Sequence, residues 1–178
     1  GAQTASYSRN PLGQVTNAET KDGSNQTIVA YDYSYDSAHR LNTVIDSRAG
    51  KSLTYTWTPG GRLARVVDSD GHSTSFAYDG VGRLSSLTAP NGENVSFVWD
   101  AGGRLIEKRL NSGLRTTQSW FEDGSLKDKK NLFSATTLSS HVYTLDSQGR
   151  RATHAETING TAKNWTYGYD NLDRLTSS

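Results

Sequence analysis

Three kinds of side chain that could do chemistry recur along this chain at matching places. The carboxylates are Asp36, Asp79, Asp100, Asp146 and Asp170. The guanidinium groups are Arg40, Arg62, Arg83, Arg104, Arg150 and Arg174. The rings are Tyr35, Trp57, Tyr78, Trp99 and Trp120. Recurrent carboxylates could form an acid–base pair or a row of metal sites, the arginines could bind anions, and the rings could stack on sugars.

The spacing of these residues favours a structural role for the carboxylates. In the most complete copy, Asp79 is followed by Gly82 and Arg83. An Asp at that place accepts hydrogen bonds from backbone amides of a tight turn, and Gly supplies the positive φ that closes a type I turn with a bulge. Catalysis needs one asymmetric constellation, whereas these residues come in many copies. We therefore expect no enzyme activity, no catalytic residue and no cofactor.

The arginines are expected to strengthen the same turns. A guanidinium group prefers planar partners, so each one should stack on a neighbouring ring or pair with an Asp of the adjacent repeat. The residues expected to build the turns are Asp36, Arg40, Gly61, Arg62, Asp79, Gly82, Arg83, Asp100, Gly103, Arg104, Gly149, Arg150, Asp170 and Arg174.

The row of rings leaves two interpretations open. Rings at one position of successive repeats would lie side by side, and cross-strand ring pairs stabilise a single-layer sheet. An exposed row could instead stack on carbohydrate, with a glycan as ligand. Tyr35, Trp57, Tyr78, Trp99 and Trp120 are the candidate stacking residues.

The histidines give no indication of a metal site. No two of His39, His72, His141 and His154 are two or four residues apart, as metal-binding pairs often are. The run Asp68-Ser69-Asp70-Gly71 lacks the Glu and the Gly position of a calcium loop, and we interpret it as a hairpin turn.

The ring, Asp, Gly and Arg belong to one repeated segment. The template aromatic-x-[Tyr/Trp]-Asp-x-x-Gly-Arg-Leu is most complete at residues 76–84 and recurs at 33–41, 55–63 and 97–105. Weaker copies occupy 120–126, 145–151 and 169–175, with a faint one at 9–15. The anchor position recurs at residues 35, 57, 78, 99, 120, 145 and 169, which are 21 to 25 residues apart. This regularity indicates a repeat protein.

Each repeat predicts two strands joined by a turn. Phe76 and Tyr78 stand two apart and therefore share one face of an extended strand. After the turn come short aliphatic and β-branched runs, such as 41–45, 63–67 and 84–88. A second set of turn signals follows them at Ala49-Gly50, Asp70-Gly71, Asn91-Gly92, Ser112-Gly113 and Asn159-Gly160. The predicted fold is all-β, a long twisted antiparallel meander of repeated hairpins that winds into a spiral ribbon of about eight units and roughly sixteen strands.

Three departures from the template predict local irregularities. His39 and Asp173 stand where Gly is expected, and Asn10, Thr58 and Phe121 stand where Asp is expected, so these turns should be altered. Residues 27–33 are long for a strand, which predicts a bulge. Residues 127–140 lengthen one repeat, and we interpret them as a longer turn or bulge at the sheet edge, with a binding loop as the alternative.

The repeated segments resemble the YD repeats of the Rhs/YD-repeat family, which includes bacterial Rhs and wall-associated toxins, shell subunits of insecticidal toxin complexes, and teneurins. The resemblance covers roughly the whole chain from Tyr7 on. It implies a wall segment of a larger hollow shell that encloses a C-terminal effector, in a secreted or cell-surface bacterial protein. The implied partners are the rest of the parent chain and that effector. The alternative is an adhesin module that binds carbohydrate or protein.

Composition narrows the remaining functions. The net charge of +1 with scattered Lys and Arg gives no support for nucleic-acid binding, and no run approaches the roughly 18 apolar residues of a membrane helix. We expect residues 1–6 to be a tag remnant or linker and residues 7–178 to form one array of repeats, as a fragment of a longer protein. Uncovered edge strands of such a fragment should promote self-association.

Overall fold

The computed structural model describes residues 2–178, and these residues fold into β-strands and turns with no helix. The absence of helices leaves no helical segment in residues 2–178 that could cross a membrane. The strands are β1 (Thr4–Arg9), β2 (Val15–Lys21), β3 (Thr27–Tyr35), β4 (Leu41–Asp46), β5 (Lys51–Trp57), β6 (Leu63–Asp68), β7 (Ser73–Tyr78), β8 (Leu84–Thr88), β9 (Asn94–Trp99), β10 (Leu105–Leu110), β11 (Leu114–Trp120), β12 (Leu126–Phe133), β13 (Thr136–Leu145), β14 (Arg151–Ile158), β15 (Thr161–Thr166), β16 (Gly168–Tyr169) and β17 (Leu175–Ser177).

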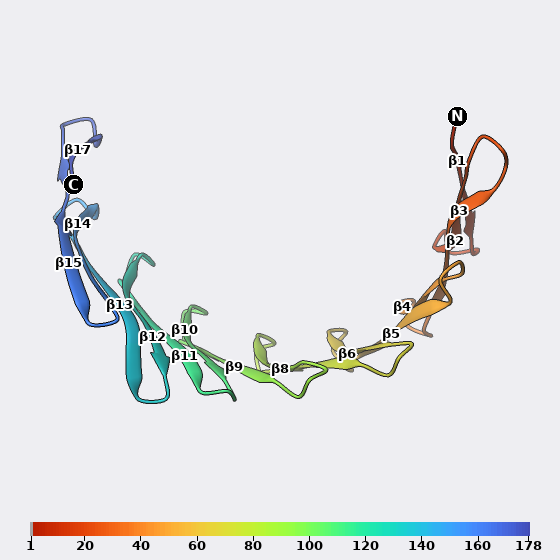
Figure 1. The fold of residues 1–178 in the computed structure, drawn as a ribbon, viewed down its shortest axis with the longest axis horizontal. Helices are drawn as coiled ribbons and strands as arrows, with labels where there is room; N and C mark the ends of the chain where they lie inside the picture. Colours follow the sequence, from red (N-terminus) through yellow and green to blue (C-terminus); the bar gives the residue numbers. More distant parts are fainter. Residues whose placement is uncertain (1) are drawn as a thin grey trace. The chain divides into compact units, whose positions relative to one another are not determined.

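The strands form an antiparallel meander, as the repeats predict. One 15-stranded sheet contains β1 to β15 in sequence order, and β16 and β17 form a two-stranded pair (Figure 1). The predicted all-β meander of hairpins is therefore confirmed. Paired strands begin at Thr4, ahead of the boundary expected at Tyr7.

The chain divides into two compact units. The first comprises the described residues up to 77 together with 88–91, and it holds β1 to β6 and most of β7. The second comprises 78–87 and 92–178, and it holds β9 to β17 and most of β8. Both units are built from the same hairpin, so the same local rules apply within each.

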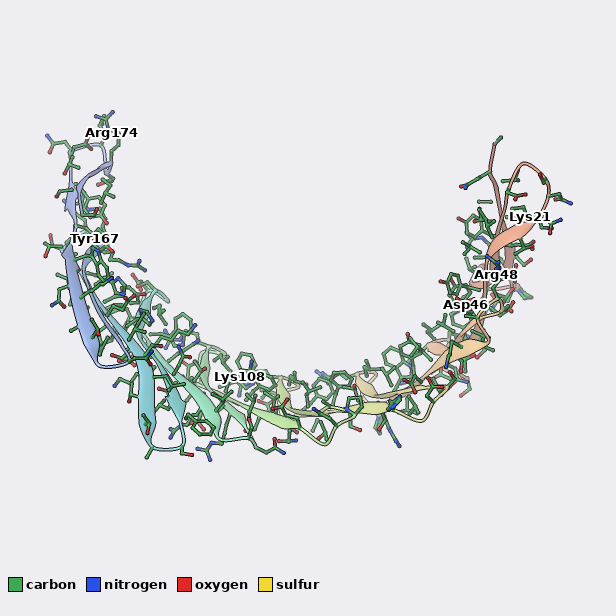
Figure 2. All side chains as sticks on the ribbon, in the orientation of Figure 1. Lys21, Asp46, Arg48, Lys108, Tyr167 and Arg174 are labelled. Carbon is green, nitrogen blue, oxygen red and sulfur yellow. The ribbon has the colours of Figure 1, made fainter. Side chains whose placement is uncertain are left out.

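Neither unit contains a buried core. None of the described residues is classed as buried, and the rings of the template are half-buried. Within each unit, side chains stand on the ribbon without a second layer of strands over them (Figure 2). The alternation expected of a strand is visible in β9, where Val98 is 45% exposed while Phe97 and Trp99 are half-buried. Stability must therefore come from cross-strand side-chain pairs and hydrogen bonds instead of a closed core.

A β-bulge follows the repeat turn in several repeats of both units. In the first unit, Tyr35 pairs with Leu41 and Ser34 pairs with Thr43, so the return strand carries one extra residue at Asn42. The same shift follows Trp57, and in the second unit it follows Trp99, Trp120 and Leu145. A bulge interrupts the ladder of backbone hydrogen bonds at that place and increases the local twist. The bulge expected in residues 27–33 is also present, because Lys21 pairs with Thr27 while Thr20 pairs with Val29.

The long repeat at residues 127–140 contains the expected bulge, but it does not form a longer turn and does not lie at a sheet edge. Its residues lie almost entirely in β12 and β13, which are joined by a short turn at Ser134, so the extra length extends a hairpin. A bulge between Asn131 and Leu132 accommodates the extension. The strand β13 lies between β12 and β14, and the segment is neither a sheet edge nor a loop.

The second set of turns uses two geometries. Asn159 and Gly160 have φ values of 47° and 82°, the two positive values of a type I′ hairpin. Asp46 lies at the β4–β5 turn near Arg48 (Figure 2), and its Oδ1 accepts hydrogen bonds from the amides of Arg48 and Ala49 at 3.0 and 2.9 Å. Asp68 caps its own turn in the same way as the repeat Asp residues, and the interpretation as a hairpin turn is correct.

Candidate functional site

The repeat turn has one backbone geometry throughout both units. In the copy at residues 79–83, the amide of Asp79 donates to the carbonyl of Arg83 at 2.8 Å, and the amide of Gly82 donates to the carbonyl of Asp79 at 2.9 Å. Gly82 has a φ of 86°. These are the hydrogen bonds and the left-handed residue of a type I turn closed by a glycine bulge.

The Asp side chain holds the turn from inside. Asp79 Oδ1 accepts from the amides of Val81 and Arg83 at 3.1 and 2.8 Å, and Asp79 Oδ2 accepts from Arg83 Nε at 2.7 Å. The hydrogen bond from the Arg83 amide is the main cause that lowers the pKa of Asp79, followed by the guanidinium hydrogen bond. The pKa values of Asp36, Asp100 and Asp170 are lowered by the same two contacts in their own turns. The carboxylates are consequently committed to the turn.

Four of the arginines, Arg40, Arg83, Arg104 and Arg150, also reach the next repeat. Arg83 Nη1 donates to the carbonyl of Asp100 at 2.8 Å, and Arg104 Nη1 donates to the carbonyl of Phe121 at 2.8 Å. Arg40 makes the equivalent bond to Thr58 at 3.2 Å. This geometry differs from the expected ion pair with the adjacent repeat, because the ion pair lies within the repeat and the neighbour supplies a backbone carbonyl. Arg150 is the exception, since it also pairs with Asp173 of the following repeat.

The stacking expected of the arginines is present in several repeats. The guanidinium carbon of Arg40 lies 5.7 Å from the ring centroid of Trp57, and that of Arg83 lies 6.0 Å from the ring of Trp99. Arg150 lies 4.6 Å from the ring of Tyr169. Cation–π attraction at such partly exposed places is worth about 0.5–1 kcal/mol.

The rings at the anchor position bind the preceding repeat. Trp99 Nε1 donates to the carbonyl of Leu84 at 2.8 Å, and Trp120 Nε1 donates to that of Leu105 at 2.8 Å. The equivalent bonds run from Trp57 to Leu41, from Tyr35 to Val15 and from Tyr169 to Arg151. In each case the acceptor is the residue that follows the Arg position. The polar edges of these rings therefore serve the backbone.

The candidate stacking residues all end strands of the sheet. Tyr35, Trp57, Tyr78, Trp99 and Trp120 are the last residues of β3, β5, β7, β9 and β11, and all five are half-buried. Within the described parts of their units no second layer of strands covers them, and the guanidinium groups of Arg40 and Arg83 lie over the rings of Trp57 and Trp99. A ligand face remains a prediction.

The template departures leave the turn backbone unchanged, and the expectation of altered turns is wrong. His39 and Asp173 replace Gly but adopt φ values of 62° and 60° and keep the same hydrogen bonds. Asn10 replaces Asp and still accepts from the amides of Leu12 and Gln14 at 3.0 Å. The surrounding ladder holds these residues in a conformation that costs about 1–2 kcal/mol for most side chains.

A cluster that the sequence analysis missed lies on β13 and β14. His141 Nδ1 is 3.2 Å from His154 Nε2 and 3.5 Å from a carboxylate oxygen of Glu156. The ring of His154 is stacked between Tyr143 and Trp165, at centroid distances of 4.6 and 4.7 Å. Burial lowers the pKa of His154, and the neighbouring His141 adds to that shift. The sequence pattern that could have indicated this cluster is the spacing of His154 and Glu156, which are two residues apart on one strand. Only the pairing register of β14 with β13 brings His141 next to them.

The repeat is found in an established family. Residues 57–95 match the family model described as RHS Repeat. The chain contains an RHS repeat. This match confirms the resemblance proposed from the template. A search of curated proteins found no match to the chain.

Solved structures resemble the chain well beyond residues 57–95. A crystal structure of TcdB2-TccC3 matches with a TM-score of 0.62 and 17% identity over 97% of this chain and 12% of that chain. TcdB2-TccC3 without its hypervariable C-terminal region gives the same values. The Photorhabdus luminescens Tc holotoxin pore matches with a TM-score of 0.62 and 17% identity over 97% of this chain and 11% of that one.

These comparisons establish the fold. At 17% identity the match shows a shared fold, and the RHS-repeat chain spans about an eighth or less of the chains that it matches. The chain is built from β-hairpin repeats, and residues 57–95 among them match the RHS Repeat model.

Proposed function

We propose that this chain is a wall segment of an encapsulating β-shell, within a secreted Rhs-type toxin or a cell-surface protein. The observation that carries the proposal is the reciprocal bonding between repeats. Arg83 reaches forward to the carbonyl of Asp100, while Trp99 reaches back to the carbonyl of Leu84. These bonds join successive turns at one margin of the sheet, which suits a wall whose strands must stay in register without a core.

The chemistry of the side chains supports a structural role and no catalysis. The repeated Asp carboxylates are saturated by the turn amides and by Arg, and their pKa values are lowered, so at neutral pH they offer no proton to a substrate. The N–H and O–H groups of the rings donate hydrogen bonds to backbone carbonyls. The partners of such a wall are the rest of the parent chain and a C-terminal effector, in keeping with the likeness to TcdB2-TccC3.

The test is cryo-electron microscopy of the natural polypeptide that contains these 178 residues. We expect the repeats to continue into a closed β-wall around an enclosed segment, and that segment to resist protease. An open array with a freely cleaved neighbouring segment would contradict the proposal.

A second measurement separates the wall from a carbohydrate-binding module. Trp57, Trp99 and Trp120 are the indole rings of the ring row and report on ligand binding there by their fluorescence. The wall predicts that their fluorescence does not change on titration with oligosaccharides. Saturable changes that are lost in Trp99→Phe would favour the adhesin alternative.

The edges of the sheet give a further expectation for the isolated chain. All residues of β1 are exposed, and Tyr7 on this strand is 63% exposed. An edge strand with free backbone groups pairs readily with another chain. We expect concentration-dependent self-association by size-exclusion chromatography with light scattering. A constant monomer mass at high concentration would contradict this expectation.

A further inference from the structure

We propose that His141, His154 and Glu156 form a binding site for a divalent transition-metal ion of the zinc type. The proposal goes beyond the wall function, and it reverses the expectation from histidine spacing that the chain has no metal site. It depends on the geometry of β13 and β14 (Figure 1).

The sheet register brings the three side chains to one face. His141 on β13 is the direct cross-strand partner of Glu156 on β14, and His154 lies two residues from Glu156 on the same strand. Residues two apart on a strand, and direct cross-strand partners, project from the same face. The nitrogen and oxygen ligand atoms of all three side chains lie within 4.8 Å of one another.

The two distances from His141 Nδ1 to the other ligand atoms fit a tetrahedral ion. Zinc bonds to nitrogen and oxygen of about 2.0–2.1 Å place the ligand atoms of a tetrahedron about 3.3 Å apart. The structure has 3.2 Å between His141 Nδ1 and His154 Nε2, and 3.5 Å between His141 Nδ1 and Glu156 Oε2. Three protein ligands of this kind leave a fourth position for water.

Hydrogen bonding alone serves this arrangement poorly. His141 Nδ1 lies close to both His154 Nε2 and the Glu156 carboxylate, but one ring nitrogen either carries one hydrogen or offers one lone pair. In either tautomer it makes a good hydrogen bond to only one of these two neighbours. A cation between the three atoms accepts a lone pair from each at once.

The surroundings support the ligands and also set a limit on affinity. The side chains of His141 and Glu156 are 22% and 19% exposed, so they are partly desolvated yet open to an entering ion. Tyr143 and Trp165 stack on either side of His154 and hold its orientation. Lys129 is the cross-strand partner of His141, and Lys163 is that of Glu156, so two cations flank the site. Their charge opposes a bound cation.

The first test is calorimetric titration of the full chain, prepared without a histidine tag, with zinc sulfate at neutral pH. We expect one ion per chain. His154→Phe keeps a ring between Tyr143 and Trp165 but removes the ligand nitrogen, and it should weaken binding by more than about tenfold. His72→Gln is the matched control, because His72 belongs to a separate group with Asp68 and Asp70 and its loss should not change the affinity.

Copper provides a reading of position. Cu²⁺ binds such ligands more tightly than zinc and quenches nearby indoles. The ring of Trp165 lies 4.7 Å from that of His154, so one equivalent of Cu²⁺ should quench Trp165 and the quenching should disappear in Trp165→Phe. A substitution in the opposite direction, Lys129→Gln, should tighten zinc binding several-fold because it removes a repelling charge.

Several outcomes would overturn the site. These are no zinc binding by the natural chain, equal binding by His154→Phe, loss of binding in His72→Gln, or copper quenching that persists in Trp165→Phe. Circular dichroism of each variant separates loss of the ligand from loss of the fold.

Discussion

Removing a single hydroxyl from Tyr35 tests whether the anchor rings join successive repeats. The hydroxyl of Tyr35 donates to the carbonyl of Val15 at 2.8 Å, the usual length of a strong O–H···O bond. Val15 lies beside the bulge that follows the first repeat turn, where Ser8 pairs with Asn17 and Arg9 pairs with Val15. Tyr35→Phe keeps the ring and removes only this bond.

The expected loss follows from the half-buried position of the contact. A hydrogen bond of this kind contributes about 0.5–1.5 kcal/mol net, and water can reach the freed carbonyl of Val15 in part. We expect the free energy of unfolding to fall by about 1 kcal/mol. For a chain of this length that corresponds to a decrease of about 2–4 °C in Tm.

A matched control lies two residues away on the same strand. Tyr33 is half-buried on β3 like Tyr35, and within residues 2–178 its hydroxyl has no hydrogen-bond partner. Tyr33→Phe should therefore change the free energy of unfolding by less than about 0.5 kcal/mol.

The measurements are urea unfolding and native-state amide exchange. Repeat arrays can open locally, so exchange of the amides of β2 and β3 should accelerate more than exchange in β13. Equal losses for Tyr35→Phe and Tyr33→Phe, or no loss for Tyr35→Phe, would refute the reasoning that the ring hydroxyl stabilises the neighbouring repeat.

Three further predictions concern the repeat turn. Gly82→Ala should lower the free energy of unfolding by about 1 kcal/mol, because Gly82 has a φ of 86°. Gly80 lies in open space without a positive φ, so Gly80→Ala should be neutral or slightly stabilising. Equal decreases in the urea midpoints of the two variants would count against the turn geometry. Arg83→Gln should lower Tm more than Arg174→Gln does. Arg83 also bonds to the next repeat, whereas the side chain of Arg174 is 73% exposed and pairs with Asp170. A larger decrease in Tm for Arg174→Gln would contradict this prediction. The lowered pKa of Asp79 means that its contribution to stability is complete above the unfolded pKa of about 4 and is lost as pH falls through the lower folded pKa. The urea midpoint, measured from pH 7 to pH 2, should therefore decrease once the pH is below about 4. Asp79→Asn should make this decrease smaller. The same pH dependence of the urea midpoint in Asp79→Asn and the natural chain would argue against the pKa shift.

The repeat template predicted the local structure well, because strands and turns are specified by a few neighbouring residues. The ring pair Phe76 and Tyr78, the Asp79 cap and Gly82 define strand and turn through alternation, amide acceptance and a positive φ. The template was wrong about His39, which was expected to alter its turn. The paired strands on either side of it impose the left-handed conformation that the residue alone disfavours.

The sequence by itself thus determined the repeat, the all-β class and the order of the strands, since a short-period template and tight turns allow each strand only its chain neighbours as partners. The tertiary structure decided which groups meet between repeats. The bond from Arg83 to the carbonyl of Asp100 depends on how far one turn stands from the next, and the meeting of His141 with His154 and Glu156 depends on the register of two strands. Distances of this kind are set by pairing and by bulges, which a pattern of residue types does not encode.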